Sequence, residues 1–174
     1  PLAGADRDDM LSPLLDRMAI YQSFQQIGGA RAALEMARDF SLQRFIFGRP
    51  LASYQATKHK LAEILIKLEL ARALAMHAVS ELASGADSIG KSAAAARIAA
   101  TQAYEEAARE NLQIHGGIGF TWEANVHFHL RRSRLLALDL GSLEYWSKRL
   151  IVALSADLDR HDACDNMEGS TDGQ

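Results

Sequence analysis

Apolar residues recur every three or four positions along most of the chain, which is the spacing that places them on one face of an α-helix. The first such run extends from residue 14 to about residue 47. Ser12 and Pro13 precede it as a typical N-cap and first helical residue. Gly28 and Gly29 interrupt the run, and we expect a neighbouring backbone to pack closely against them.

A second helical pattern follows a clear break. Gly48 and Pro50 end the first helix, because proline cannot continue it and restricts the residue before it. Ser53 is positioned to cap the second helix, whose apolar residues keep helical spacing from Leu61 to Leu82 over about six turns. A turn is expected at residues 84–87.

Three more helices complete the pattern. The third covers about residues 88–114 and is rich in alanine, whose small side chain lets helices approach closely. Thr121 is expected to cap a short helix that ends near residue 132, and a last helix begins near Ser142. One face of this last helix is apolar and carries Leu143, Trp146, Leu150 and Leu154.

No segment has the alternating pattern of a strand of convincing length, so the sequence predicts an all-α fold. We expect an up-and-down bundle of three long helices, with a fourth helix supplied after the glycine-rich loop near residue 116. The bundle should occupy residues 13–160. Residues 1–12 read as a loose linker, and residues 161–174 as a disordered acidic tail.

Composition narrows the classes of function. The 174 residues are 48% hydrophobic and 24% charged, which is enough apolar material for one core. A net charge of −3 argues against a nucleic-acid or anionic-membrane surface, and the apolar runs are too short to span a membrane. A single cysteine, Cys164, fits a reducing compartment such as the cytoplasm. The chain begins at Pro1, and we expect it to be a piece of a longer protein.

Residues 111–123 contain the densest cluster of glycines, at Gly116, Gly117 and Gly119. One interpretation is a helix C-cap, and the other is a loop whose backbone N–H groups meet a phosphate or ribose. No strand precedes the cluster, so a Rossmann turn is not favoured. Nearby, His127 and His129 do not share a helix face, and we predict no metal site there.

The motifs, taken in order, resemble the C-terminal helical domain of the acyl-CoA dehydrogenases over roughly residues 14–158. They are Arg44-Phe-Ile-Phe-Gly-Arg-Pro-Leu51, Gln55, Lys60-Leu-Ala-Glu63, Ala71-Arg72, Gln113-Ile-His-Gly-Gly-Ile-Gly-Phe120, Arg131 and Gly141-Ser142. The resemblance implies an oxidation between Cα and Cβ of an acyl-CoA thioester. In the family a carboxylate takes the α-proton, and a hydride passes to an FAD that lies mostly on a separate β-domain.

The resemblance also implies residues that contact FAD. Arg44 would pair with the pyrophosphate of the FAD in a neighbouring subunit, Phe47 would pack beside that cofactor, and Gln55 would add a polar contact. Gln113 and Gly117 would meet its ADP-ribose part.

Two further cofactor positions depart from the usual residues. Ser142 stands where a threonine is usual. Glu144 stands where a glutamine is usual, and a carboxylate is a poorer partner for a nucleotide than an amide.

The catalytic base is missing from both positions that the family uses. The usual glutamate position is Leu140, and the alternative position on the first helix is Met18. The nearest acids, Asp139 and Asp16, would each point about 100–200° away around a helix, so neither is expected to serve as the base. An arginine that helps hold CoA in many relatives corresponds to Ala19.

The sequence therefore leads to a hypothesis of a family member with a degenerate active site. It would act as a homodimer or homotetramer, or as an α2β2 assembly with a base-bearing relative, with acyl-CoA as substrate and electron-transfer flavoprotein as a candidate acceptor. Two alternatives stay open. One is a structural helical bundle that has lost flavin, and the other is a competent enzyme whose base lies in an N-terminal part.

Overall fold

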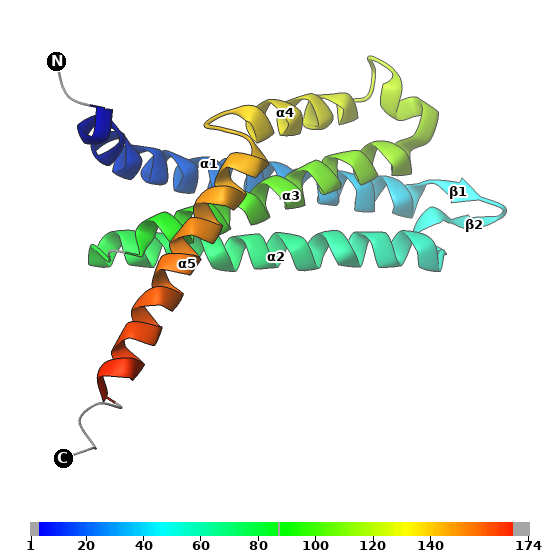
Figure 1. Ribbon diagram of the computed structural model, residues 1–174. Helices are drawn as coiled ribbons and strands as arrows, with labels where there is room; N and C mark the ends of the chain where they lie inside the picture. The colour runs from blue at the N-terminus through cyan, green and yellow to red at the C-terminus, as the bar shows by residue number, and fades with distance from the viewer. Residues whose placement is uncertain (1–3, 87, 169–174) are drawn as a thin grey trace.

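The computed structural model describes the backbone of residues 4–86 and 88–168 and the side chains of residues 11–86 and 88–158. Five α-helices dominate the described chain (Figure 1). They are α1 (Gly4–Gln43), α2 (Gln55–Ser84), α3 (Ile89–His115), α4 (Val126–Leu138) and α5 (Leu143–Glu168). Short elements join them: strands β1 (Phe45–Ile46) and β2 (Arg49–Pro50), and 3-10 helices η1 (Leu51–Ser53) and η2 (Gly116–Phe120).

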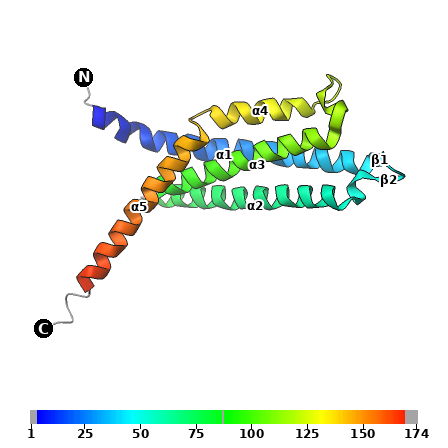
Figure 2. The ribbon, with the colours of Figure 1, turned by 45° about the vertical axis from the view of Figure 1, so that its right-hand side comes forward.

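Helices α1 to α4 run alternately up and down, and α5 crosses them at an angle so that its C-terminal half extends away from the bundle (Figures 1 and 2). Helix α3 occupies the centre and packs against α1, α2, α4 and α5. This arrangement confirms the predicted all-α bundle, with α4 as the fourth helix after the glycine-rich loop.

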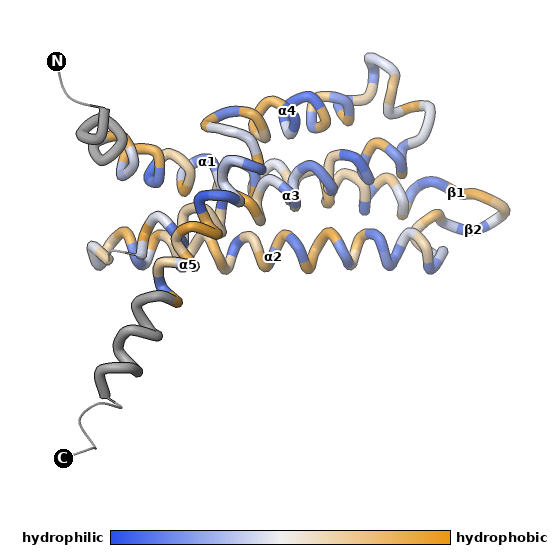
Figure 3. Tube along the Cα trace, in the orientation of Figure 1, coloured by the Kyte–Doolittle hydropathy of each residue, from blue (hydrophilic) through white to orange (hydrophobic). Residues whose placement is uncertain are grey.

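Alanine makes the centre of the bundle close-packed. Apolar and polar residues alternate along each long helix, as amphipathic helices require (Figure 3). The fully buried alanines of α3 are Ala93, Ala94, Ala96, Ala100, Ala103, Ala107 and Ala108. The predicted approach of a neighbouring backbone to the paired glycines is not found: at Gly29 the close neighbour is the Tyr104 side chain, whose ring a Cβ would meet at 2.5 Å, and at Gly28 a Cβ would meet nothing within 4 Å.

The connection between α1 and α2 differs from the prediction. Helix α1 ends at Gln43, and the next residues form a two-stranded antiparallel hairpin that pairs Phe45 with Pro50. Ser53 does not cap α2; its hydroxyl donates to the Pro50 carbonyl at 2.7 Å, and Tyr54 is the N-cap without a side-chain bond. The chain therefore forms a short hairpin where the sequence predicted the last turn of the first helix.

The ends of the chain are more helical than predicted. Helix α1 begins at Gly4, so Ser12 and Pro13 lie inside it and the predicted N-cap at Ser12 is wrong. The Ser12 hydroxyl instead accepts a hydrogen bond from Arg149 at 2.5 Å. Helix α5 continues to Glu168, and residues 169–174 lie outside the described residues.

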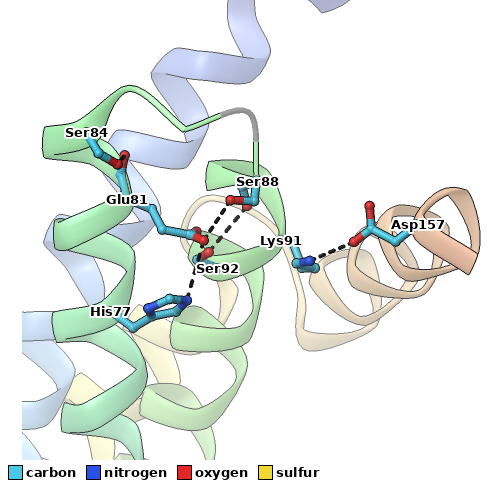
Figure 4. Close-up of polar contacts among 7 residues, drawn as sticks. All are labelled: His77, Glu81, Ser84, Ser88, Lys91, Ser92 and Asp157. Atoms are coloured by element: carbon cyan, nitrogen blue, oxygen red, sulfur yellow. Dashed lines mark hydrogen bonds and ion pairs between the residues drawn. The ribbon is translucent and has the colours of Figure 1, made fainter. Parts of the chain in front are cut away.

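The turn between α2 and α3 has the expected position. Gly85 adopts a left-handed φ of 68° and caps α2. Ser88 donates to the Glu81 carboxylate at 2.6 Å, and His77 lies 3.4 Å from the same carboxylate (Figure 4). On the other side of α3, Lys91 pairs with Asp157 of α5 at 2.6 Å, which ties the crossing helix to the bundle (Figure 4).

Helix α4 starts later and ends later than predicted. Thr121 does not cap it; its hydroxyl donates back to the Ile118 carbonyl at 2.9 Å and closes the end of η2. The helix begins at Val126 after Asn125 and runs to Leu138. Because α4 is about a turn and a half longer than predicted, Leu140 lies in the short turn between α4 and α5.

Candidate functional site

One recess of about 700 Å3 lies where the end of α1, the start of α2 and the end of α3 converge. We call it the hairpin recess, and its polar wall is formed by Arg44, Lys60, Glu110 and Gln113, with Gly117 at its edge. Three of the sequence-predicted cofactor residues, Arg44, Gln113 and Gly117, therefore share one cavity.

Arg44 is fixed by its backbone and free at its side chain. Its N–H donates to the Phe40 carbonyl at 2.9 Å and its carbonyl accepts from Leu51 at 2.7 Å, so both sides of the hairpin hold it. The side chain is exposed and makes no ion pair with any described residue. An unpaired guanidinium beside a cavity is suited to an anionic ligand.

Phe47 stands at the tip of the hairpin. Its φ is 50°, a left-handed value that is rare for a bulky residue, and the following Gly48 has φ 78°. The side chain is 95% exposed. Tyr54 holds both strands of the hairpin. Its hydroxyl donates to the Ile46 carbonyl at 2.8 Å, and the Arg49 Cζ lies 3.9 Å from the centroid of its ring. Gln55 follows as the exposed first residue of α2.

The glycine cluster acts first as a helix terminator. Gly116 has φ 59°, and its N–H donates to the carbonyls of Leu112 and Gln113 at the end of α3. Gly119 is buried, and a Cβ there would lie 2.9 Å from the Leu112 side chain. His115 stacks on Phe40 with ring centroids 4.1 Å apart. Gly117 has open space where a Cβ would be, at the edge of the recess.

A second recess of about 350 Å3 lies between α1 and the turn that joins α4 to α5. We call it the corner recess. Met18 and Leu140, the two positions that the resemblance implies for a base, both line it, together with Asp139 and Gln22. The structure therefore brings the two candidate base positions together although they are distant in the sequence.

The backbone at Leu140 is strained and firmly held. Its φ is 60°, and Gly141 follows with φ 102°. Buried Arg97 donates to the Leu136 carbonyl at 2.5 Å and to the Asp139 carbonyl at 2.8 Å, and Trp146 donates its indole N–H to the Leu140 carbonyl at 3.1 Å. Burial lowers the pKa of Arg97, while the Asp139 charge raises it. Left-handed bulky residues persist only where neighbours fix them in this way.

The nearby carboxylates occupy different positions. Asp16 is 3% exposed and pairs with Arg149 at 2.8 Å, and burial raises the pKa of Asp16 against the opposing effect of Arg149. Asp139, by contrast, does line the corner recess, and one of its oxygens accepts from Gln22 at 2.9 Å. The predicted direction of the Asp139 side chain, which assumed a helix, is wrong. Asp139 has a ψ of 140° and lies in an extended segment past the end of α4.

Two predicted cofactor residues lie away from the hairpin recess, at the start of α5. The Ser142 hydroxyl accepts the N–H of Tyr145 at 3.3 Å and caps the helix. Glu144 is exposed and pairs with Lys148 one turn later at 2.7 Å. Trp146, on the apolar face of α5, is 1% exposed and packs with Ala19 and Ala94.

The histidines of α4 are used for packing. His127 donates its Nδ1–H to the Ala124 carbonyl at 2.8 Å, and its ring packs edge-to-face against Trp122. His129 lies 3.3 Å from the Tyr104 hydroxyl, and burial followed by the Arg132 charge lowers the pKa of His129. Among the described residues, no group of three or more potential ligands is placed to hold a metal ion, and no helix is long and apolar enough to cross a membrane.

Comparison with known proteins places this chain and its fold in one family. Residues 10–155 match the family described as acyl-CoA dehydrogenase, C-terminal domain. The chain is 37% identical over 123 residues to acyl-CoA dehydrogenase IpdE2 of Mycobacterium tuberculosis. The aligned residues make up 69% of this chain and 36% of that protein. It therefore belongs to the acyl-CoA dehydrogenase family, as the motifs indicated.

Solved structures show the same likeness. Butyryl-CoA dehydrogenase from Megasphaera elsdenii aligns with a TM-score of 0.80 and 31% identity over 84% of this chain and 38% of that one. A variant of the Tcur3481–Tcur3483 steroid ACAD aligns with a TM-score of 0.82 and 28% identity over 86% and 41%. The chain thus spans well under half the length of the relatives it matches.

Proposed function

We propose that this chain is the C-terminal helical domain of an FAD-dependent acyl-CoA dehydrogenase and that its hairpin recess contacts FAD held by a neighbouring subunit. The exposure of Phe47 is the observation that carries the proposal. A phenylalanine that is 95% exposed in a left-handed conformation gains nothing within its own chain, and the unpaired Arg44 lies at the base of the same hairpin. Both features suit contact with a cofactor bound by another subunit.

The residues of the hairpin recess fit an anionic nucleotide. Arg44 and Lys60 supply two positive charges against one negative charge from Glu110, and Gly117 leaves the approach to the backbone open. When bound, FAD would supply the acceptor for the hydride from the acyl-CoA. The contribution of this chain is to bind the nucleotide half and to help assemble the subunits.

The corner recess supports a degenerate active site. Neither Leu140 nor Met18 can accept a proton, Asp16 is buried in its pair with Arg149, and Asp139 is bound to Gln22. General-base catalysis needs a basic group within hydrogen-bond reach of the proton.

The chain would therefore act in a homo-oligomer or an α2β2 assembly with a base-bearing relative. The similar steroid ACAD carries the names of two proteins, which favours the α2β2 form. Acyl-CoA is the proposed substrate of the assembly, and electron-transfer flavoprotein is a candidate acceptor.

A flavin absorbance spectrum of the full-length protein, recorded alone and with the product of its neighbouring gene, tests this function. We expect bound FAD that acyl-CoA bleaches only when the base-bearing partner is present. A protein that stays colourless under both conditions would instead be a structural helical bundle that has lost flavin. Rapid bleaching of the protein alone would indicate a base that this chain or its N-terminal part supplies.

A further inference from the structure

An ion pair lies in the wall of the hairpin recess; its lysine belongs to the motif Lys60-Leu-Ala-Glu63, and its glutamate, Glu110, belongs to none of the motifs. Lys60 of α2 pairs with Glu110 of α3, and both side chains line the recess with Arg44. The Glu110 side chain is 11% exposed, whereas the Lys60 side chain remains 46% exposed. The carboxylate is thus enclosed while the lysine still faces solvent at the recess.

The pair holds the Lys60 ammonium in place. An ammonium carries three N–H donors, and the Glu110 contact uses one of them, so two remain for a further ligand. Arg109 approaches the other Glu110 oxygen at 3.5 Å, which helps fix the carboxylate. A long side chain that is already held in place loses less entropy when a ligand binds.

The charge of the recess points to a diphosphate. Arg44 and Lys60 place two positive charges at the recess against the one negative charge of Glu110, so the recess keeps a net positive charge that suits a diphosphate. We propose that Lys60 is a second phosphate-binding residue, which Glu110 positions so that it binds the diphosphate of an adenine nucleotide together with Arg44. The proposal rests on the function proposed above and adds a residue to it.

The chain contains a matched control for this pair. Lys67 and Glu106 form the same kind of ion pair between the same two helices, with side chains that are 48% and 20% exposed. Lys67 lies two helical turns further along α2, and neither residue of this pair lines the hairpin recess. Any general effect of breaking a lysine–glutamate pair between α2 and α3 therefore appears in both.

The experiment compares FAD affinity in the full-length assembly after reconstitution of the apoprotein, followed by quenching of FAD fluorescence. Lys60→Met should raise the Kd for FAD about 10- to 100-fold, the range for a hydrogen bond to a charged group. Lys67→Met should change the Kd less than about twofold, and Lys60→Arg should restore most of the affinity because it keeps the charge. Competition should separate the contacts: Lys60→Met should weaken ADP as a competitor and leave adenosine unaffected.

The outcomes distinguish this inference from the proposed function. If Arg44→Ala weakens FAD but Lys60→Met behaves as Lys67→Met does, Lys60 is not a phosphate ligand and the inference fails alone. If neither Arg44→Ala nor Lys60→Met changes the Kd, the recess does not contact FAD and the proposed function fails with it. Equal weakening of ADP and adenosine by Lys60→Met would also overturn the inference, because it would indicate a loss of recess structure.

Discussion

Leu140 and Met18 line the same recess, although one follows α4 and the other lies in α1. A carboxylate at either position would reach the same cavity. If the resemblance assigns the base positions correctly, this shared cavity accounts for a base on either segment. Neither leucine nor methionine can accept a proton, which is the basis of the proposed degenerate site.

The packing of α1 on α3 is tested by two neighbouring glycines. Gly29→Ala should lower the free energy of unfolding by about 1–3 kcal/mol, the usual cost of overpacking, since its Cβ would lie 2.5 Å from the Tyr104 ring. Gly28→Ala should instead stabilise the chain by up to about 1 kcal/mol, because alanine is the better helix former and its Cβ meets nothing. Urea unfolding measures both. Similar values for the two variants would contradict this packing.

The role of Arg44 is tested by its removal. In the full-length assembly, Arg44→Ala should weaken FAD binding by about 1.5–3 kcal/mol, because a charged hydrogen bond to phosphate is lost. Arg72→Ala is the control, since Arg72 is exposed on α2 and does not line the hairpin recess. Equilibrium titration with FAD measures both. An unchanged affinity for Arg44→Ala would remove this residue from the cofactor site.

Self-association should involve α2. Its outward face exposes Leu65, Ile66, Leu70 and Met76 at 48%, 68%, 56% and 55%. Apolar patches of this kind mark interfaces, so light scattering at micromolar concentration should report at least a dimer. Ile66→Glu should shift the population toward monomer, whereas Gln102→Glu on α3 should not. A wild-type monomer at that concentration would refute the assembly.

The sequence was sufficient for the regular parts of the fold. Helical spacing located α2, α3 and the start of α5 to within a residue or two, because long amphipathic helices repeat one signal many times. The capping residues Ser12, Ser53 and Thr121 gave wrong predictions because their hydroxyls bond other partners. Ser53 and Thr121 donate to carbonyls three residues earlier, and Ser12 accepts from the distant Arg149. The sequence did not predict the hairpin after α1, because each of its strands has only two residues and shows no alternating pattern.

The site residues were predictable only in part. Motif order identified Arg44, Gln113 and Gly117, and the structure places them at one recess. No local pattern could show that Lys60 and Glu110 meet across two helices, or that buried Arg97 holds the turn at Leu140. Asp139 was assigned to the wrong direction because the sequence did not reveal that α4 ends just before it.

The central claim is that this chain lacks its own base, and Leu140→Glu tests it. Arg97 and Trp146 fix the backbone of this turn, so glutamate should adopt the same left-handed conformation and present its carboxylate to the corner recess. Leu138→Glu is the matched control, because Leu138 is 73% exposed and does not line that recess.

The most direct measurement is flavin reduction in the full-length, FAD-loaded protein after addition of a panel of acyl-CoAs. We predict no bleaching for wild type or Leu138→Glu alone, and a gain of about 10²–10⁴ in rate for Leu140→Glu, the usual contribution of a general base. Rapid bleaching of the wild-type protein alone would contradict the account. Asp139, the one carboxylate that the described structure places at the corner recess, would then be the first residue to replace.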